Sequence, residues 1–231
     1  MASATILDQD SEGIVARHEV AWETYRQLRD DPANDHLRME YLDGTLTIMS
    51  PDPIHEEAAD LMGLVVRGTA AGCGIAIKGL RSTTLRRGIA AFKGSGKDPD
   101  NAFYVGPHVE AMTSFRKLRK AKLNLDVDRP PDLAIEIEVD HSRDSTGSLS
   151  TYARLGVPEV WRYDVAEDTL RFFRLAEGGY LEVDRSVVLP RLTPMLVIEA
   201  LDLLDARPAY DEAAYLDQVR AWAQALPDVA P

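Results

Sequence analysis

The sequence predicts an α/β protein in which helices cover the faces of a mixed β-sheet. Short runs with the two-residue apolar alternation of strands recur along the chain, and segments with helical apolar spacing separate them. The run 131–139 alternates acidic and apolar residues, as a strand with two different faces does. Strands and helices mixed in this order are typical of a sheet with helices on its faces.

In the N-terminal half, apolar spacing predicts helices at 14–29 and 55–71. Asp43 and Gly44 form a dipeptide that favours a hairpin turn between two of the strands. Residues 88–98, which contain two glycines close together, read as a loop. Strands are predicted at 37–41, 45–49, 74–80, 82–86 and 101–105.

In the C-terminal half, the acidic run 131–139 is the strongest strand, and a helix at 147–155 is predicted to end at Gly156, a residue suited to a helix C-terminus. Further strands are predicted at 160–164, 170–175 and 180–188, and further helices at 193–204 and 210–226.

Composition predicts one globular domain. With 231 residues, 45% hydrophobic and 28% charged, the chain can bury one sizeable core. We expect a flexible tail at 1–13 and a single domain over 14–231. There is no run of eighteen apolar residues and no signal-peptide pattern at the N-terminus, so we expect a cytoplasmic protein without a membrane partner. The one cysteine, Cys73, excludes an internal disulfide and a zinc site built from cysteines.

Charge is distributed unevenly. The net charge of −12 argues against general attraction to nucleic acid. Residues 78–122 nevertheless carry eleven Lys and Arg against three acids, with the densest part at Arg116–Lys122. This region either contacts the phosphates of a nucleic acid or is a solvated helix end.

The acidic strand carries the clearest functional signal. Successive strand residues point to opposite faces, so Asp132, Glu136 and Glu138 share one face and the apolar residues between them share the other. Clustered carboxylates repel one another and lose hydration when buried. A hard divalent cation would offset this penalty, whereas an edge strand with a solvated acidic face would avoid it.

Several stretches, taken together and in order, resemble the Uma2 (DUF820-type) family. They are Arg38–Gly44 with Met49-Ser50-Pro51, then His55-Glu56, Pro99-Asp100, Pro131–Glu136 and Tyr152–Asp164. The resemblance spans roughly 18–222. It implies a restriction-endonuclease-like fold of the PD-(D/E)xK superfamily and metal-dependent cleavage of DNA phosphodiester bonds.

The resemblance implies catalytic roles for Asp100, Glu136 and Glu138, with Asp100 and Glu136 holding Mg²⁺ or Mn²⁺. Such an ion polarises the phosphate and activates a water for in-line attack on phosphorus. Glu56 is either a further ligand or an acid favoured by a helix N-terminus. Asp132 is either a ligand or a cap at the strand entrance. A histidine base at His55 or His141 stays an alternative to ordinary hydrogen-bonded histidines.

The chain departs from the family pattern at two positions. Glu138 stands where the motif ends in lysine, and Ser148 stands where many Uma2 relatives carry one. Lys78, on a candidate neighbouring strand, is one substitute for the missing positive charge. These departures leave open a non-catalytic protein that binds nucleic acid or a protein partner on the same fold, and a hydrolase of another phosphoester. Cutting two strands favours two active sites, so we expect a homodimer.

Overall fold

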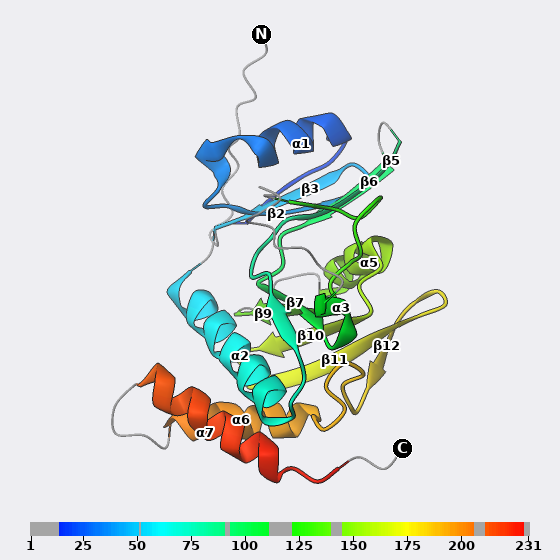
Figure 1. The fold of residues 1–231 in the computed structure, drawn as a ribbon. Helices are drawn as coiled ribbons and strands as arrows, with labels where there is room; N and C mark the ends of the chain where they lie inside the picture. Colours follow the sequence, from blue (N-terminus) through cyan, green and yellow to red (C-terminus); the bar gives the residue numbers. More distant parts are fainter. Residues whose placement is uncertain are drawn as a thin grey trace.

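The computed structural model describes residues 14–50, 52–90, 93–110, 122–139, 145–205 and 211–228. Its strands form two six-stranded sheets (Figure 1). The predicted tail at 1–13, the densest basic residues at 116–121, and His141 lie outside the described residues. Within the described part of the chain, no helix has both the length and the apolar character needed to cross a membrane.

The first sheet, called sheet A here, contains most of the N-terminal strands. One of its faces packs against helix α1 (Trp22–Asp30), where Tyr25, Met39, Tyr41 and Leu46 form a small apolar core. A short 3-10 turn follows α1 at Pro32–Asn34. The strand order is β1 (Ile14–Arg17), β3 (Thr45–Met49), β2 (Arg38–Leu42), β6 (Lys93–Lys97), β5 (Leu85–Ala90) and β8 (Leu123–Asn124).

Strand β6 was predicted as a loop because of its glycines, and the structure gives the reason for them. A Cβ atom on Gly94 would lie 2.5 Å from the Trp22 ring, and one on Gly96 would lie 2.1 Å from the Tyr25 hydroxyl. The glycines therefore face helix α1, which approaches the sheet too closely for side chains. Lys97, the next residue after Gly96 in the strand, points to the opposite face.

The second sheet, sheet B, holds the acidic strand at its centre. Strand β9 (Leu133–Glu138) pairs in parallel with β10 (Glu159–Asp164) and antiparallel with β7 (Asn101–Val105). The strand order is β12 (Gly179–Val183), β11 (Thr169–Ala176), β10, β9, β7 and β4 (Ile77–Gly79). The four-residue helix α3 (Pro107–Glu110) follows β7. Each sheet is mixed, since each contains one parallel pair.

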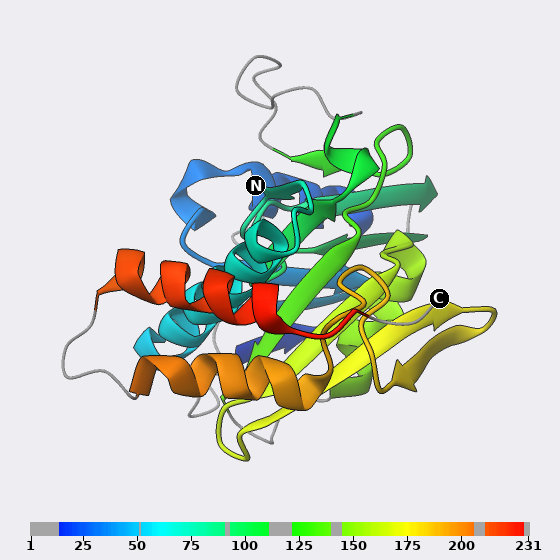
Figure 2. The same ribbon diagram turned by 60° about the horizontal axis from the view of Figure 1, so that its bottom comes forward.

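Helices cover both faces of sheet B. Helices α2 (Pro53–Gly72), α6 (Pro194–Asp205) and α7 (Glu212–Ala225) lie together on one face (Figures 1 and 2). There they form the main apolar core with alternate residues of β9, namely Leu133, Ile135 and Ile137. Helix α5 (Ser145–Leu155) packs on the other face and also contacts β2, β5 and β6 of sheet A.

The predicted class, an α/β protein with mixed sheets flanked by helices, is confirmed, but the strands divide between two sheets where we expected one. The predicted helix at 14–29 is a strand followed by α1, and the strand predicted at 180–188 ends at Val183. The predicted end of α5 is correct, because Gly156 has a positive φ of 78° and its N–H bonds to the Tyr152 carbonyl.

Candidate functional site

Glu136 is the central carboxylate of the site. The alternation along β9 turns its apolar neighbours Ile135 and Ile137 into the main core and leaves Glu136 on the face covered by α5. The residue is only 9% exposed. A carboxylate so deeply buried requires polar partners, because its hydration is lost.

Helix α5 supplies two of these partners. The Tyr152 hydroxyl donates to Oε1 of Glu136, and the Ser148 hydroxyl lies 3.4 Å from Oε2. The two residues are four apart in the helix, so their side chains project from the same face. Two side chains on one face of α5 thus contact Glu136.

Sheet A supplies a third partner. The Nζ atom of Lys97 lies 2.9 Å from Oε2 of Glu136 and 2.9 Å from Oε2 of Glu40, and the side chain is 2% exposed. Glu40 is the cross-strand neighbour of Lys97, and it also accepts a hydrogen bond of 2.5 Å from Thr151 of α5. Although burial lowers the pKa of Lys97, the carboxylates of Glu136 and Glu40 raise it above its ordinary value.

Asp100 is brought beside Glu136 by the pairing of β7 with β9. It precedes β7, whose first residue pairs with Ile135, and its Oδ2 atom accepts the backbone N–H of Ile137 at 2.7 Å. Nε2 of His55 lies 3.1 Å from the same oxygen. Burial alone would raise the pKa of Asp100, but the hydrogen bond with His55 and the N–H of Ile137 keep it below its ordinary value.

His55 and Glu56 are positioned by the start of helix α2. Asp52 caps the helix by accepting the His55 N–H at 2.8 Å, and Pro53 occupies the first turn. Glu56 is half exposed, lies 3.1 Å from a guanidinium nitrogen of Arg38, and is 3.6 Å from Nδ1 of His55. Glu56 thus lies beside His55, a partner of Asp100, while its own carboxylate is paired with Arg38.

The site carries excess negative charge. Glu40 and Glu136 both contact the single ammonium of Lys97, and Asp100 adds a third carboxylate beside Glu136, so with His55 neutral the fully ionised cluster carries two negative charges in excess. Burial and the charge of Asp100 outweigh the ammonium and raise the pKa of Glu136 to about 7.

These residues fit a hard divalent cation in charge and in donor type. Carboxylate oxygens are the ligands that Mg²⁺ and Mn²⁺ prefer. Among the described residues, no group of three or more His, Cys, Asp or Glu side chains is gathered in a way that could hold an ion. A cation here would therefore take Asp100 and Glu136 as ligands and complete its shell with water and substrate oxygens, which is the usual mode for Mg²⁺.

The other predicted acids have different partners. Glu138 is ion-paired with Arg162 of β10, whose Nε lies 2.9 Å from Oε1 of the carboxylate. Asp132 accepts the backbone N–H of Val105 at 2.8 Å, and its other oxygen lies 2.7 Å from Nδ1 of His108. The contacts of Asp132 are those of a cap at the strand entrance.

The positive charge beside Glu136 was predicted in the wrong place. Lys78 pairs across strands with Tyr104, at the end of sheet B where Asp132 lies. Lys97 was missed because residues 88–98 read as a loop. The one available signal was the alternation of Gly94 and Gly96 with Ser95 and Lys97, which has the period of a strand with one crowded face.

Several described members of the basic region 78–122 are paired with acids. Arg86 and Lys122 both pair with Asp30 of α1, and Arg81 lies 2.6 Å from Asp60. Arg86 holds the pKa of Asp30 at about 2. The densest basic residues, at 116–121, lie outside the described residues.

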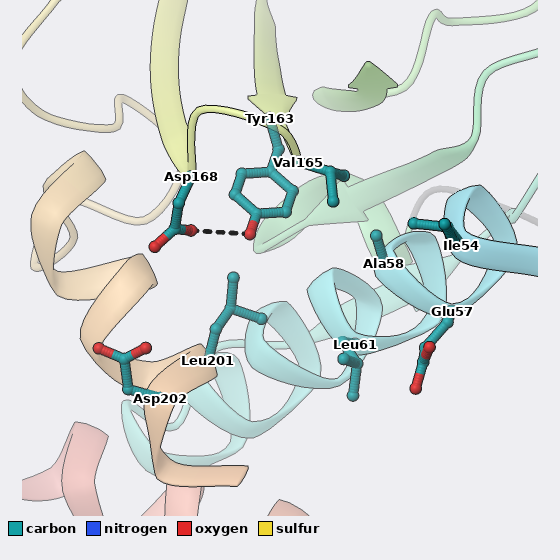
Figure 3. Close-up of a pocket in the computed structure, with 9 residues that line it drawn as sticks. All are labelled: Ile54, Glu57, Ala58, Leu61, Tyr163, Val165, Asp168, Leu201 and Asp202. Atoms are coloured by element: carbon teal, nitrogen blue, oxygen red, sulfur yellow. Dashed lines mark hydrogen bonds between the residues drawn. The ribbon is translucent and has the colours of Figure 1, made fainter. Parts of the chain in front are cut away.

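The pocket in Figure 3 is separate from this site. It has a volume of about 290 Å³ and lies where the start of α2, the β10–β11 turn and α6 meet. Tyr163, which lines it and donates to Asp168, follows Arg162 in β10 and so faces away from the Glu136 side of sheet B. Its charged residues are all acidic, which disfavours a phosphodiester there. The pocket is lined by Ile54, Glu57, Ala58, Leu61, Tyr163, Val165, Asp168, Leu201 and Asp202.

Comparison with known proteins identifies a family whose model matches most of this chain. The model of the Uma2 family, described as "Putative restriction endonuclease", matches residues 22–206. A solved structure described as that of "a putative nuclease belonging to DUF820 from Anabaena variabilis ATCC 29413" is similar, with 15% sequence identity and a TM-score of 0.41, over 79% of this chain and 90% of that one. No curated protein gives a significant match.

Proposed function

The chain belongs to the Uma2 family, and from this premise we propose that it is a metal-dependent endonuclease that hydrolyses DNA phosphodiester bonds. The observation that carries the proposal is the pair of buried carboxylates of Asp100, just before β7, and Glu136, on the neighbouring strand β9, in a cluster with more carboxylates than cationic groups. Buried acids are rarely left uncompensated, and a divalent cation would compensate these.

The proposed ligands are Asp100 and Glu136, with Mg²⁺ or Mn²⁺ as the cation. When bound, the cation polarises the scissile phosphate and makes a water molecule acidic enough to act as the nucleophile. Glu56 and Asp132 are left out of this ligand set, because Glu56 is half exposed and paired with Arg38, and Asp132 caps the far end of β9.

The chain's own residues orient the ligands. The Ile137 N–H and His55 hold one oxygen of Asp100, so the other oxygen has a defined direction. Tyr152 and Lys97 hold the two oxygens of Glu136 from α5 and from sheet A. Partners that fix the ligating groups in this way commonly change metal affinity or activity by about 10–100-fold when they are removed.

The proposal is tested by incubating purified protein with plasmid and with single-stranded DNA in Mg²⁺, Mn²⁺ or EDTA. We expect cleavage with the metals, none in EDTA, and a loss on the order of 100-fold in Glu136→Gln. Gln keeps the size of the side chain and removes its charge. Cleavage that persists in EDTA, or in the variant, would show that Glu136 holds no essential cation.

One observation favours the non-catalytic alternative. Both oxygens of Glu136 already accept hydrogen bonds or an ion pair from Tyr152, Ser148 and Lys97, so a metal has to share them. A non-catalytic protein on this fold would bind DNA in a gel-shift assay, with the same affinity in EDTA and in Mn²⁺, and would cleave nothing.

We also propose a homodimer as the active form and the segment 116–121 as a contact with DNA phosphates. Support comes from the two strands of the substrate and from the five basic residues among the seven at 116–122. Light scattering measures the first. Replacing Arg116, Lys117, Arg119 and Lys120 by Gln tests the second, since loss of phosphate contacts flattens the salt dependence of DNA binding.

A further inference from the structure

We propose that Lys97 is a positioning residue of the carboxylate site. Its ammonium, anchored to Glu40 of sheet A, fixes the orientation in which Glu136 of sheet B holds a divalent cation. The inference rests on the proposed function, and it assigns to the site a residue that belongs to neither of the two strands carrying the ligands.

The contacts of Lys97 support this role. Nζ lies 2.9 Å from an oxygen of Glu40 and 2.9 Å from Oε2 of Glu136, and it lies 5.8 Å from the centre of the Tyr152 ring. Tyr152 donates to the other oxygen of Glu136. The Glu136 carboxylate is therefore held from two sides, by Lys97 of sheet A and by Tyr152 of α5, and it cannot rotate without breaking one of these contacts.

The position of Lys97 in the fold argues against a purely structural role. A buried ion pair adds little net stability, because desolvation of both charges offsets their attraction. The role that we infer for this pair is to define a geometry, as some buried ion pairs do. Here it defines the geometry of Glu136, the buried acid of β9 beside Asp100, across the junction of two sheets.

The inference can be tested by moving the ammonium group from position 97 to position 148. The Ser148 hydroxyl lies 3.4 Å from the same Glu136 oxygen that Lys97 contacts, and the residue is half-buried, so a longer side chain has room at its outer edge. A lysine there would deliver an ammonium to Glu136 from α5 instead of from sheet A.

The experiment compares cleavage by Lys97→Met, Ser148→Lys and the double variant Lys97→Met/Ser148→Lys. We expect Lys97→Met to lower kcat on the order of 100-fold while the KM for DNA is unchanged, because the lost contact acts on the cation and not on DNA binding. The double variant should recover at least about tenfold of that loss. Glu40→Gln, which removes the anchor but keeps the ammonium, should lower kcat about tenfold.

The matched control is Arg29→Met. Arg29 is another buried cation of this protein, 3.4 Å from the buried Asp98, and it belongs to the cluster between α1 and sheet A. We expect this variant to unfold more easily but to keep the kcat of its folded fraction. If Lys97→Met kept the wild-type kcat, or if it behaved as Arg29→Met does and relocation recovered nothing, the inference would be wrong.

A second readout does not depend on cleavage. A buried, hydrogen-bonded ammonium exchanges its protons slowly, so the nitrogen–proton NMR signal of Lys97 should be observable. Paramagnetic Mn²⁺ should broaden this signal, Mg²⁺ should only shift it, and Glu136→Gln should abolish the broadening. If wild-type protein cleaved nothing, the proposed function would fail, and this readout alone would decide whether Lys97 adjoins a cation site. A sharp signal in Mn²⁺ would overturn the inference.

Discussion

Two buried carboxylates lie along the acidic run, Asp132 just before strand β9 and Glu136 within it, but they are held in different ways. Asp132 accepts the backbone N–H of Val105 at one oxygen and lies beside His108 at the other. Among the described residues, the partners of Glu136 are side chains, of Tyr152, Ser148 and Lys97, which come from α5 and from the other sheet.

The difference separates a structural acid from a candidate ligand. The N–H of Val105 ties one oxygen of Asp132 to the pairing of the strands, since that donor cannot move without breaking the sheet, and His108 lies at the other oxygen. Glu136 is instead held by side chains next to another acid, so a cation that shares its oxygens relieves the repulsion between the acids and breaks no strand pairing. From the acidic pattern of the sequence alone, Asp132 and Glu136 look equivalent.

The largest expected contrast is in cleavage. Glu136→Gln should lower the rate on the order of 100-fold, whereas Asp132→Asn should keep it within about threefold once correction is made for unfolded protein. Plasmid nicking in Mn²⁺ measures both. Equal losses in the two variants would break the comparison.

Stabilisation of the folded protein by metal should also distinguish Asp132 from Glu136. A cation that binds only the folded protein raises the free energy of unfolding by about 2.7 kcal/mol at one hundred times its dissociation constant. We expect this rise for the wild type and for Asp132→Asn in Mn²⁺, and none for Glu136→Gln. Urea titrations with Mn²⁺ and with EDTA give the values. If the free energy of unfolding rose as much in Glu136→Gln as in the wild type, the cation would not be bound at Glu136.

Stability without metal should show the opposite order. Asp132→Asn places an amide where Val105, His108 and Arg129 all approach a carboxylate, and this should lower the free energy of unfolding by about 1–3 kcal/mol. Glu136→Gln should have a smaller effect, because it also removes the repulsion with Asp100. Denaturation in EDTA at pH 8 compares them.

The smallest effect concerns pH. Since the folded protein raises the pKa of Glu136 to about 7, the protonated form is favoured by folding, and its contribution is present at low pH and is lost as the pH rises through 7. Metal-free wild-type protein should therefore lose more stability between pH 5 and 8 than Glu136→Gln does. Parallel pH profiles in the two proteins would show that Glu136 is ionised throughout this range.

Sequence reasoning found the strands better than it found the site. The alternation of β9 and the end of α5 at Gly156 were predicted correctly, because both are set by residues close together in the chain. The carboxylates of Asp100 and Glu136 were predicted together, and the structure brings them together, although their metal role stays a proposal. Glu138 was grouped with them, yet it pairs with Arg162, which sits beside it only through the parallel pairing of β9 with β10.

The sequence by itself determined which residues of β9 face the apolar core and which face the other way, since that depends only on the two-residue period of a strand. Only the tertiary structure decided the partners of Glu136. Lys97 reaches it from another sheet, and Lys97 and Glu40 are 57 residues apart in the chain. Contacts between distant residues depend on how sheets and helices pack, and local patterns in the chain carry no record of that packing.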